Sequence, residues 1–179
     1  DLDYARRKAK AVNFGIVYGI SDFGLSEQLE ISVPEARSII QAFFKAYPEI
    51  WSFRQKIINE VQDNGYVTTL TGRKRYIPQI NDANYQTREF AKRAAMNAPI
   101  QGSAADLIKL AMIKVDEYLT TNNYKTKLIL QVHDELIFAL DEKEHHIVDE
   151  IVSIMENVFA LPVVLKAGVS IGDNWFEAS

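Results

Sequence analysis

The chain has 179 residues, of which 47% are hydrophobic, and a formal net charge of −4. This length suffices for one buried core or for two lobes that share one, and the composition excludes a disordered chain. The sequence holds no cysteine, no apolar run of about 18 residues and no basic-then-apolar leader, which excludes disulfides, a transmembrane helix and a secretory signal. We therefore expect a soluble, cytoplasmic protein without a membrane partner, whose metal ligands are oxygen or imidazole.

The first part of the sequence is predicted to be helical. Residues 3–18 begin with acidic residues, which favour the N-terminal end of a helix. Ser32 precedes a Val-Pro-Glu sequence, and this order marks it as the N-cap of another helix. A further helix is expected over residues 49–64, where Gly65 ends it.

A basic hairpin and a long helix are predicted next. Residues 66–70 and 74–78 flank a Thr-Gly turn, which indicates two short antiparallel strands. Residues 85–121 have a helical pattern with Pro99 in the middle, and we expect this proline to bend or interrupt the helix.

The last part of the sequence changes to a strand-like pattern. Residues 127–132 and 136–140 are apolar runs with only His133, Asp134 and Glu135 between them, which predicts a tight hairpin with a polar tip. A helix over residues 144–159 and a strand over residues 163–169 should follow. Together the predicted elements indicate an α+β fold with an antiparallel sheet.

The charge is distributed unevenly along the chain. Residues 1–100 hold 14 basic and 11 acidic residues, net +3, whereas residues 101–179 hold 6 and 13, net −7. A basic half beside an acidic half suits phosphate binding next to divalent metal ions. The alternative is that these charges are the solvated faces of unrelated helices.

One face of the first helix carries residues at steps of four: Arg6, Lys10, Phe14 and Tyr18. Each step drifts only about 40° around an α-helix, so the four share one face over roughly 18 Å. The cations lie toward the helix N-terminus, which also attracts anions, and the aromatic end suits stacking on a base or sugar. This stripe has the shape of a nucleoside triphosphate, unless the aromatic residues belong to the core.

The tip of the second hairpin carries a carboxylate pair. Asp134 and Glu135 are costly neighbours unless solvent or a cation compensates them. Asp134 is suited to Mg²⁺, which accepts oxygen ligands and bridges phosphates, whereas His133 is a poor ligand for that ion. The alternative is an ordinary acidic turn.

A second stripe at steps of four comprises Arg93, Asn97 and Gln101. All three donate hydrogen bonds, and every base pair offers acceptors in the minor groove, so these donors can sense pairing without reading sequence. The alternative is the polar face of a surface helix. The run of residues 73–75 in the basic hairpin is a weaker candidate for binding backbone phosphates.

Two strings resemble sequence motifs of one enzyme family. Residues 6–19 (RRKAKAVNFGIVYG) are similar to motif B of family A DNA polymerases, the DNA polymerase I type, and residues 131–136 (QVHDEL) are similar to motif C. The likeness runs from about residue 3 to the GDNW sequence at residues 172–175. Single-subunit RNA polymerases are the nearest alternative, but they typically have Ser after the His-Asp pair and Met at the position of Phe14.

The resemblance implies that residues 1–84 form the fingers and residues 85–179 the C-terminal part of the palm. It implies that Arg6 and Lys10 bind the triphosphate of the incoming dNTP, Lys10 with a catalytic role, while Phe14 contacts the sugar and Tyr18 lies beside the templating base. Phe14 also resembles family members that discriminate against dideoxynucleotides.

In the palm, the resemblance implies that Asp134 is a catalytic metal ligand and that Glu135 is an accessory carboxylate near the metals. It places His133 near the primer end. The remaining primer–template contacts that it implies are Arg93, Asn97 and Gln101.

The implied activity is that of a DNA-directed DNA polymerase, a nucleotidyltransferase of DNA replication or repair. A primer 3′-hydroxyl attacks the α-phosphate of a dNTP, and two Mg²⁺ ions stabilise the entering and leaving oxygens. The family's motif A, with the other metal-binding aspartate, is not in the 179 residues and would lie upstream of Asp1; the thumb and exonuclease domains are also missing. We therefore expect the isolated chain to be inactive. The alternative is a nucleotide- or DNA-binding module completed by another chain, and the oligomeric state stays open.

Overall fold

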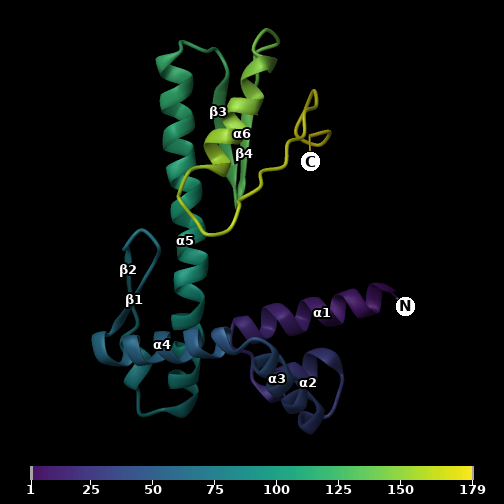
Figure 1. Cartoon of the computed structure of the whole chain (residues 1–179), viewed down its shortest axis with the longest axis vertical. Helices are drawn as coiled ribbons and strands as arrows, with labels where there is room; N and C mark the ends of the chain where they lie inside the picture. The colour runs from purple at the N-terminus through teal and green to yellow at the C-terminus, as the bar shows by residue number, and fades with distance from the viewer. Residues whose placement is uncertain (1, 179) are drawn as a thin grey trace. The chain divides into compact units, whose positions relative to one another are not determined.

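The computed structural model describes residues 2–178 of the chain, and the side chains of all of these except residues 2–4 and 7. The backbone divides into two compact units, a first unit over Asp1–Ser103 and a second over Ala104–Ser179. Helix α5 (Tyr85–Thr121) runs through the division (Figure 1). The predicted boundary between fingers and palm at residues 84 and 85 stays a prediction.

Four helices make up the N-terminal part of the first unit: α1 (Leu2–Val17), α2 (Asp22–Leu29), α3 (Val33–Ala46) and α4 (Pro48–Asn64). The side chain of Ser32 accepts a hydrogen bond from the backbone N–H of Glu35 at the start of α3. Gly65 ends α4 with φ at 77°, a left-handed value that favours glycine. The predicted helices over residues 3–18 and 49–64 and the N-cap at Ser32 are therefore confirmed.

The first unit is held by two buried clusters. Leu25 and Leu29 of α2 pack against Ala36 of α3. A larger cluster joins α4, the strand β1, the 3₁₀ helix η1 (Pro78–Asn81) and the start of α5; its buried members are Ile57, Val61, Val67, Ile77, Ile80, Ala91, Ala95 and Ala98. This cluster fixes the start of α5 and therefore the position of the second stripe, which lies on the same helix.

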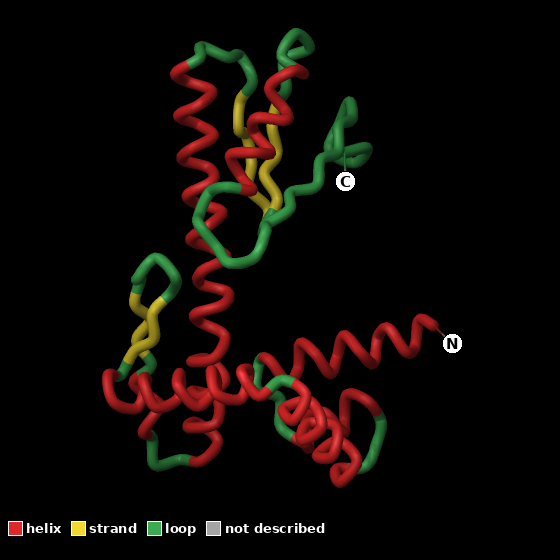
Figure 2. The backbone as a smooth tube through the Cα atoms, in the orientation of Figure 1, coloured by secondary structure: helices red, strands yellow, loops and turns green. Residues whose placement is uncertain are grey.

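The predicted basic hairpin is confirmed as the antiparallel pair β1 (Tyr66–Thr68) and β2 (Lys74–Tyr76), which Figure 2 shows in yellow. Two hydrogen bonds attach its turn to α5. The backbone N–H of Leu70 donates to the Ser103 hydroxyl at 2.9 Å, and the guanidinium of Arg73 donates to the Gly102 carbonyl at 3.1 Å. The turn is therefore fixed to one position along the helix.

Helix α5 continues through Pro99, so the helix is not interrupted there, and the bend that the sequence offered as the other outcome stays a prediction. Proline removes one backbone donor from the helix. The carbonyl that loses its helical donor is that of Ala95, four residues earlier. Beyond the proline, the Ser103 hydroxyl donates to the Pro99 carbonyl and accepts from the backbone N–H of Leu70 in the hairpin turn. The helix is therefore attached to the hairpin turn about one helical turn after the proline.

The second unit packs α5 and α6 (Val148–Glu156) beside a two-stranded antiparallel sheet, β3 (Lys127–Val132) and β4 (Glu135–Ala139). Val115 and Leu119 of α5 are buried against Ile147 and Ile151. The predicted helix over residues 144–159 begins as a 3₁₀ turn, η2 (His145–Ile147), and ends earlier than expected. With helices and small antiparallel sheets, the predicted α+β fold is confirmed.

The strand predicted over residues 163–169 is wrong, because this segment has no regular secondary structure. A strand needs a neighbour for its backbone hydrogen bonds, and in the described residues β3 and β4 pair only with each other. Side-chain contacts hold the segment instead. The backbone N–H of Ala167 donates to the Glu156 carboxylate at 3.0 Å, and the Lys166 ammonium lies 3.6 Å from the same side chain.

A carboxylate fixes the start of β3. Glu144 accepts hydrogen bonds from the backbone N–H groups of Lys125 and Thr126, both at 2.9 Å, and from the Thr126 hydroxyl at 2.7 Å. These donors, the Lys125 N–H first, lower the pKa of Glu144 from its usual value of 4.5. The interaction is therefore stronger with the ionised carboxylate than with the neutral one.

We predict that Glu144→Gln lowers the melting temperature at neutral pH and that this difference shrinks in acid. A carboxyl whose folded pKa is depressed contributes stability above its unfolded pKa, here near 4.5, and this contribution is lost as the pH falls through the lowered folded pKa. Thermal unfolding between pH 7 and pH 3 measures it. Glu142→Gln is the control with the same charge change, and a melting difference that does not depend on pH contradicts the prediction.

Candidate nucleotide and nucleic-acid interface

The stripe predicted on α1 lies on the surface of the first unit. Arg6 and Lys10 are exposed, and 55% of Phe14 is accessible to solvent. Ile16, in contrast, is only 1% exposed, so a different face of α1 enters the core. Phe14 is therefore free to meet a ligand, and the alternative that it is a core residue is wrong.

The aromatic end of the stripe forms a small platform. The rings of Phe14 and Tyr18 stack with centroids 6.3 Å apart and an angle of 24° between their planes. Such an arrangement is within the range that aromatic pairs favour, and it leaves ring surface available. Tyr18 is half-buried, which limits its motion.

The end of α1 meets α5 through Gly19. This residue has φ at 81°, and a Cβ atom placed on it would lie 3.2 Å from the Met96 sulfur and 3.3 Å from Cγ of Arg93. Both the backbone conformation and the close approach therefore favour glycine. As a result, the aromatic end of the first stripe lies beside Arg93, the first member of the second stripe.

The second stripe lies on helix α5, within the first unit. Arg93 and Gln101 are exposed on α5, and Asn97 between them is half-buried. The side-chain oxygen of Asn97 is buried and has no hydrogen-bond partner among the described residues. An unsatisfied buried acceptor costs about 1–3 kcal/mol, and this oxygen, being buried, is not the part of Asn97 that an external ligand meets.

Sequence reasoning missed how closely the basic hairpin approaches the second stripe. A Cβ atom on Gly102 would lie 2.7 Å from Cγ2 of Thr69, which is buried in the hairpin turn. Glycine inside a helix costs about 1 kcal/mol relative to alanine, so its presence at this position was the available signal. The hairpin therefore packs one residue away from Gln101.

The polar tip predicted in the second unit is present as a two-residue turn. Val132 pairs with Glu135, His133 has φ at 53°, and the Gln131 amide donates to the His133 carbonyl at 2.8 Å. His133, Asp134 and Glu135 are all exposed. The turn thus holds its carboxylates in water, at the end of a paired sheet.

The metal-binding capacity of this turn is limited. No group of three or more potential ligand side chains occurs among the described residues. Asp134 and Glu135 nevertheless fit Mg²⁺, because this ion is commonly held by one or two carboxylates together with water and substrate phosphates. They do not form a closed, all-protein site.

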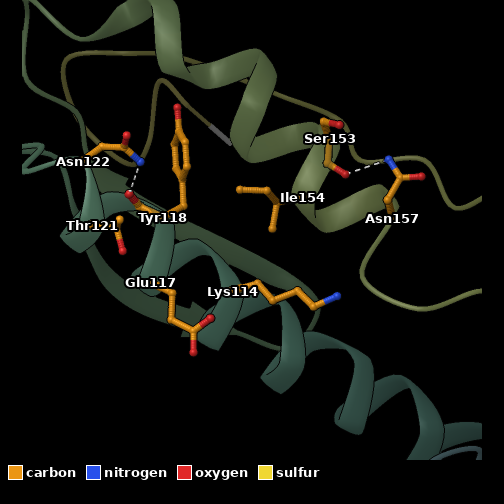
Figure 3. Close-up of a pocket in the computed structure, with 8 residues that line it drawn as sticks. All are labelled: Lys114, Glu117, Tyr118, Thr121, Asn122, Ser153, Ile154 and Asn157. Atoms are coloured by element: carbon orange, nitrogen blue, oxygen red, sulfur yellow. Dashed lines mark hydrogen bonds between the residues drawn. The ribbon is translucent and has the colours of Figure 1, made fainter.

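A separate open cavity of about 540 Å³ lies between α5 and α6 in the second unit (Figure 3). Its amides are used internally, since Asn122 donates to the Tyr118 carbonyl and Asn157 to the Ser153 carbonyl, each at 2.8 Å. The Lys114 ammonium donates to the Val158 carbonyl. No predicted site residue lines this cavity.

Among the described helices, none combines the length and apolar character needed to cross a membrane.

Comparison with known proteins gives a consistent result. Residues 3–177 match the model of DNA polymerase family A. DNA polymerase I of Caldicellulosiruptor bescii is 52% identical over 173 residues, which are 96% of this chain and 20% of that protein. DNA polymerase I of Bacillus subtilis is 47% identical over 174 residues, 97% of this chain and 20% of that protein.

A solved structure is similar over the same region. The POL domain of Pol1 from M. smegmatis, in complex with DNA primer-template and dNTP, is 40% identical and has a TM-score of 0.93; the match covers 97% of this chain and 31% of that one. The chain therefore belongs to DNA polymerase family A, as its motifs indicated. It spans about a fifth of the length of the curated relatives.

We predict that Gly102→Ala destabilises the fold by about 1–3 kcal/mol, because the added methyl group overpacks the contact with Thr69. Thr69→Ser removes the crowded Cγ2 and keeps the hydroxyl that the Arg73 N–H donates to. The double variant should therefore regain most of the loss. Chemical denaturation measures all three variants, with Gly168→Ala, which meets nothing within 4 Å, as control; absence of rescue contradicts the proposed contact.

Proposed function

We propose that this chain carries the fingers and the C-terminal part of the palm of a DNA-directed DNA polymerase that acts in the cytoplasm in replication or repair. The enzyme adds dNTPs to a primer 3′ end by two-metal phosphoryl transfer. The observation that carries the proposal is the solvent-exposed face of α1, which passes from cations to stacked aromatic rings in a chain of family A.

The cationic end of α1 is proposed to hold the triphosphate. Arg6 and Lys10 are exposed, and neither has an ion-pair partner among the side chains that the structure describes. The planar guanidinium of Arg6 is suited to terminal phosphate oxygens, and the Lys10 ammonium to the charge that develops on the leaving pyrophosphate.

The aromatic end is proposed to receive the nucleoside. Phe14 offers an exposed ring for the sugar, and Tyr18, held one helical turn away, lies beside the templating base. A phenyl ring without a hydroxyl at position 14 is the feature by which we propose discrimination against dideoxynucleotides.

The second stripe is proposed to read the newly formed base pairs. Arg93, Asn97 and Gln101 donate hydrogen bonds to minor-groove acceptors that every base pair offers, and His133 contacts the primer end. The similar M. smegmatis structure was solved with primer-template and dNTP.

The turn of the second unit is proposed to supply part of the metal site. Asp134 ligates catalytic Mg²⁺ and Glu135 acts as an accessory carboxylate nearby. Mg²⁺ held by these residues would supply charge stabilisation for the entering and leaving oxygens of phosphoryl transfer. The family resemblance implies a second aspartate from motif A, and the described residues bring no third carboxylate to this pair.

The incomplete metal site is the observation that favours an alternative function. In this alternative, the segment serves as a nucleotide- and DNA-binding module that another chain completes. Both proposals require binding of dNTP and primer–template, but only the first requires that these residues act in one continuous polymerase chain.

We predict that Lys10→Ala weakens dNTP binding by about tenfold or more, since hydrogen bonds to charged groups contribute about 1.5–3 kcal/mol. Equilibrium titration of dNTP with Mg²⁺ measures the change. Lys8→Ala is the matched control, because Lys8 lies about 200° around the helix from Lys10. Loss of thermal stability at unchanged dNTP affinity would instead assign Lys10 a structural role.

The 179-residue chain alone, supplied with Mg²⁺ and primer–template, is predicted to bind dNTP without extending the primer. The physical reason is the single aspartate at the proposed metal site, which leaves the 3′-oxygen without activation. Primer extension on a denaturing gel measures the activity. Template-dependent incorporation by the chain alone contradicts this prediction, whereas incorporation only after a second polypeptide is added supports the binding-module alternative.

A further inference from the structure

The hairpin of β1 and β2 concentrates positive charge that the proposed active site does not use. Residues 65–77 contain three basic residues and no acidic ones. Arg73 is engaged with the Gly102 carbonyl, whereas Lys74 and Arg75 are exposed, with no carboxylate within ion-pair distance among the described residues. Two cations of the hairpin are therefore available to an external anion.

Lys74 stands on an aromatic face of the hairpin. The register pairs Tyr66 with Tyr76 and Thr68 with Lys74, and alternate residues of a strand share a face, so Lys74 and both tyrosines lie together. The tyrosine rings meet edge to face with centroids 5.5 Å apart, and the Lys74 ammonium lies 4.2 Å from the Tyr66 ring centroid. Hydrogen bonding to the Tyr66 side chain raises the pKa of Lys74, so the tyrosine favours the charged ammonium.

The hairpin is held in place relative to the second stripe. Its turn is closed by the backbone hydrogen bonds from Thr69 to Arg73 and from Gly72 to Thr69, both 2.9 Å. The turn is attached to Gly102 and Ser103 of α5, next to Gln101. Any DNA that meets the second stripe therefore passes beside a rigid cationic ribbon.

We propose that Lys74 and Arg75 bind phosphates of the primer–template duplex, and that the hairpin anchors the duplex independently of its sequence. This inference rests on the proposed function, because it takes the second stripe as the surface that orients the DNA. Duplex DNA presents one phosphate about every 3.4 Å of axis on each strand. Adjacent residues of a strand point to opposite faces, so the long side chains of Lys74 and Arg75 reach separate phosphates from the two faces of the hairpin.

The geometry favours phosphate contacts over stacking of unpaired bases. The Lys74 ammonium covers one face of the Tyr66 ring, and that ring also meets Tyr76 at an angle of 64°. A base-stacking site needs an open aromatic face. The tyrosines instead hold the Lys74 ammonium in position at the surface.

The test is the salt dependence of DNA binding. Fluorescence anisotropy measures the affinity of the protein for a labelled primer–template duplex over a range of salt concentrations. Each lost phosphate contact lowers the slope of log affinity against log salt by about 1. The variant Lys74→Gln/Arg75→Gln should therefore lower the slope by about 2 and weaken binding about tenfold or more at moderate salt.

A matched control separates a site from overall charge. Lys45→Gln/Lys56→Gln removes the same charge from exposed positions on α3 and α4, and should change the slope by less than 1. The charge-conserving variant Lys74→Arg/Arg75→Lys should keep the slope, and thermal unfolding of every variant excludes a folding defect. Arg73 is left intact because it anchors the turn.

Three results would overturn the inference. The first is an equal decrease of the salt slope in the hairpin variant and in the Lys45/Lys56 control. The second is an unchanged slope in the hairpin variant. The third is a decrease of slope that the hairpin variant shows only with single-stranded DNA of the same length. In each case the proposed function still stands if Lys10→Ala lowers dNTP affinity. If the unaltered protein binds neither dNTP nor primer–template, the proposed function and the hairpin site fall together.

Discussion

The close packing of Gly19 against α5 is the contact on which the candidate site depends. A left-handed backbone at this position turns the chain directly after α1, and the absence of a side chain lets it approach Met96 and Arg93. The aromatic end of α1 and the beginning of the polar stripe on α5 are thereby held side by side in one unit. If the proposal is correct, this contact keeps the nucleoside-binding surface next to the residues that sense base pairing.

Charge separation is the second organising feature. Residues 1–100 carry a net charge of +3 and residues 101–179 a net charge of −7. The exposed cations of α1 and the hairpin attract phosphates, whereas the carboxylates of the β3–β4 turn attract divalent cations. The net charge of −4 therefore conceals two surfaces of opposite preference, and it does not argue against a nucleic-acid partner.

Features that depend on local sequence were predictable. The Ser32 cap, the left-handed Gly65 and the polar turn at His133 follow from short-range preferences. The expectation that was wrong depended on distant contacts. Residues 163–169 have a strand-like pattern but no neighbouring strand among the described residues.

The same limit explains what the sequence did not indicate. Glu144 meets Thr126 across 18 positions of sequence, and Leu70 meets Ser103 across 33. Neither pairing belongs to a motif with a fixed spacing. The spacing of four on α1 and α5 was visible because it lies within single helices, whereas the approach of these helices at Gly19 required the three-dimensional structure.

The most direct test of the account is to locate the nucleotide on the protein. A dNTP analogue with a photoreactive group on its base is crosslinked in the presence of Mg²⁺, and the labelled tryptic peptides are identified by mass spectrometry. The account predicts that labelling appears in residues 11–37, the tryptic peptide that contains Phe14 and Tyr18, and that excess unlabelled dNTP abolishes it. Competable labelling confined to peptides outside this segment would contradict the assignment of α1 as the nucleotide-binding helix.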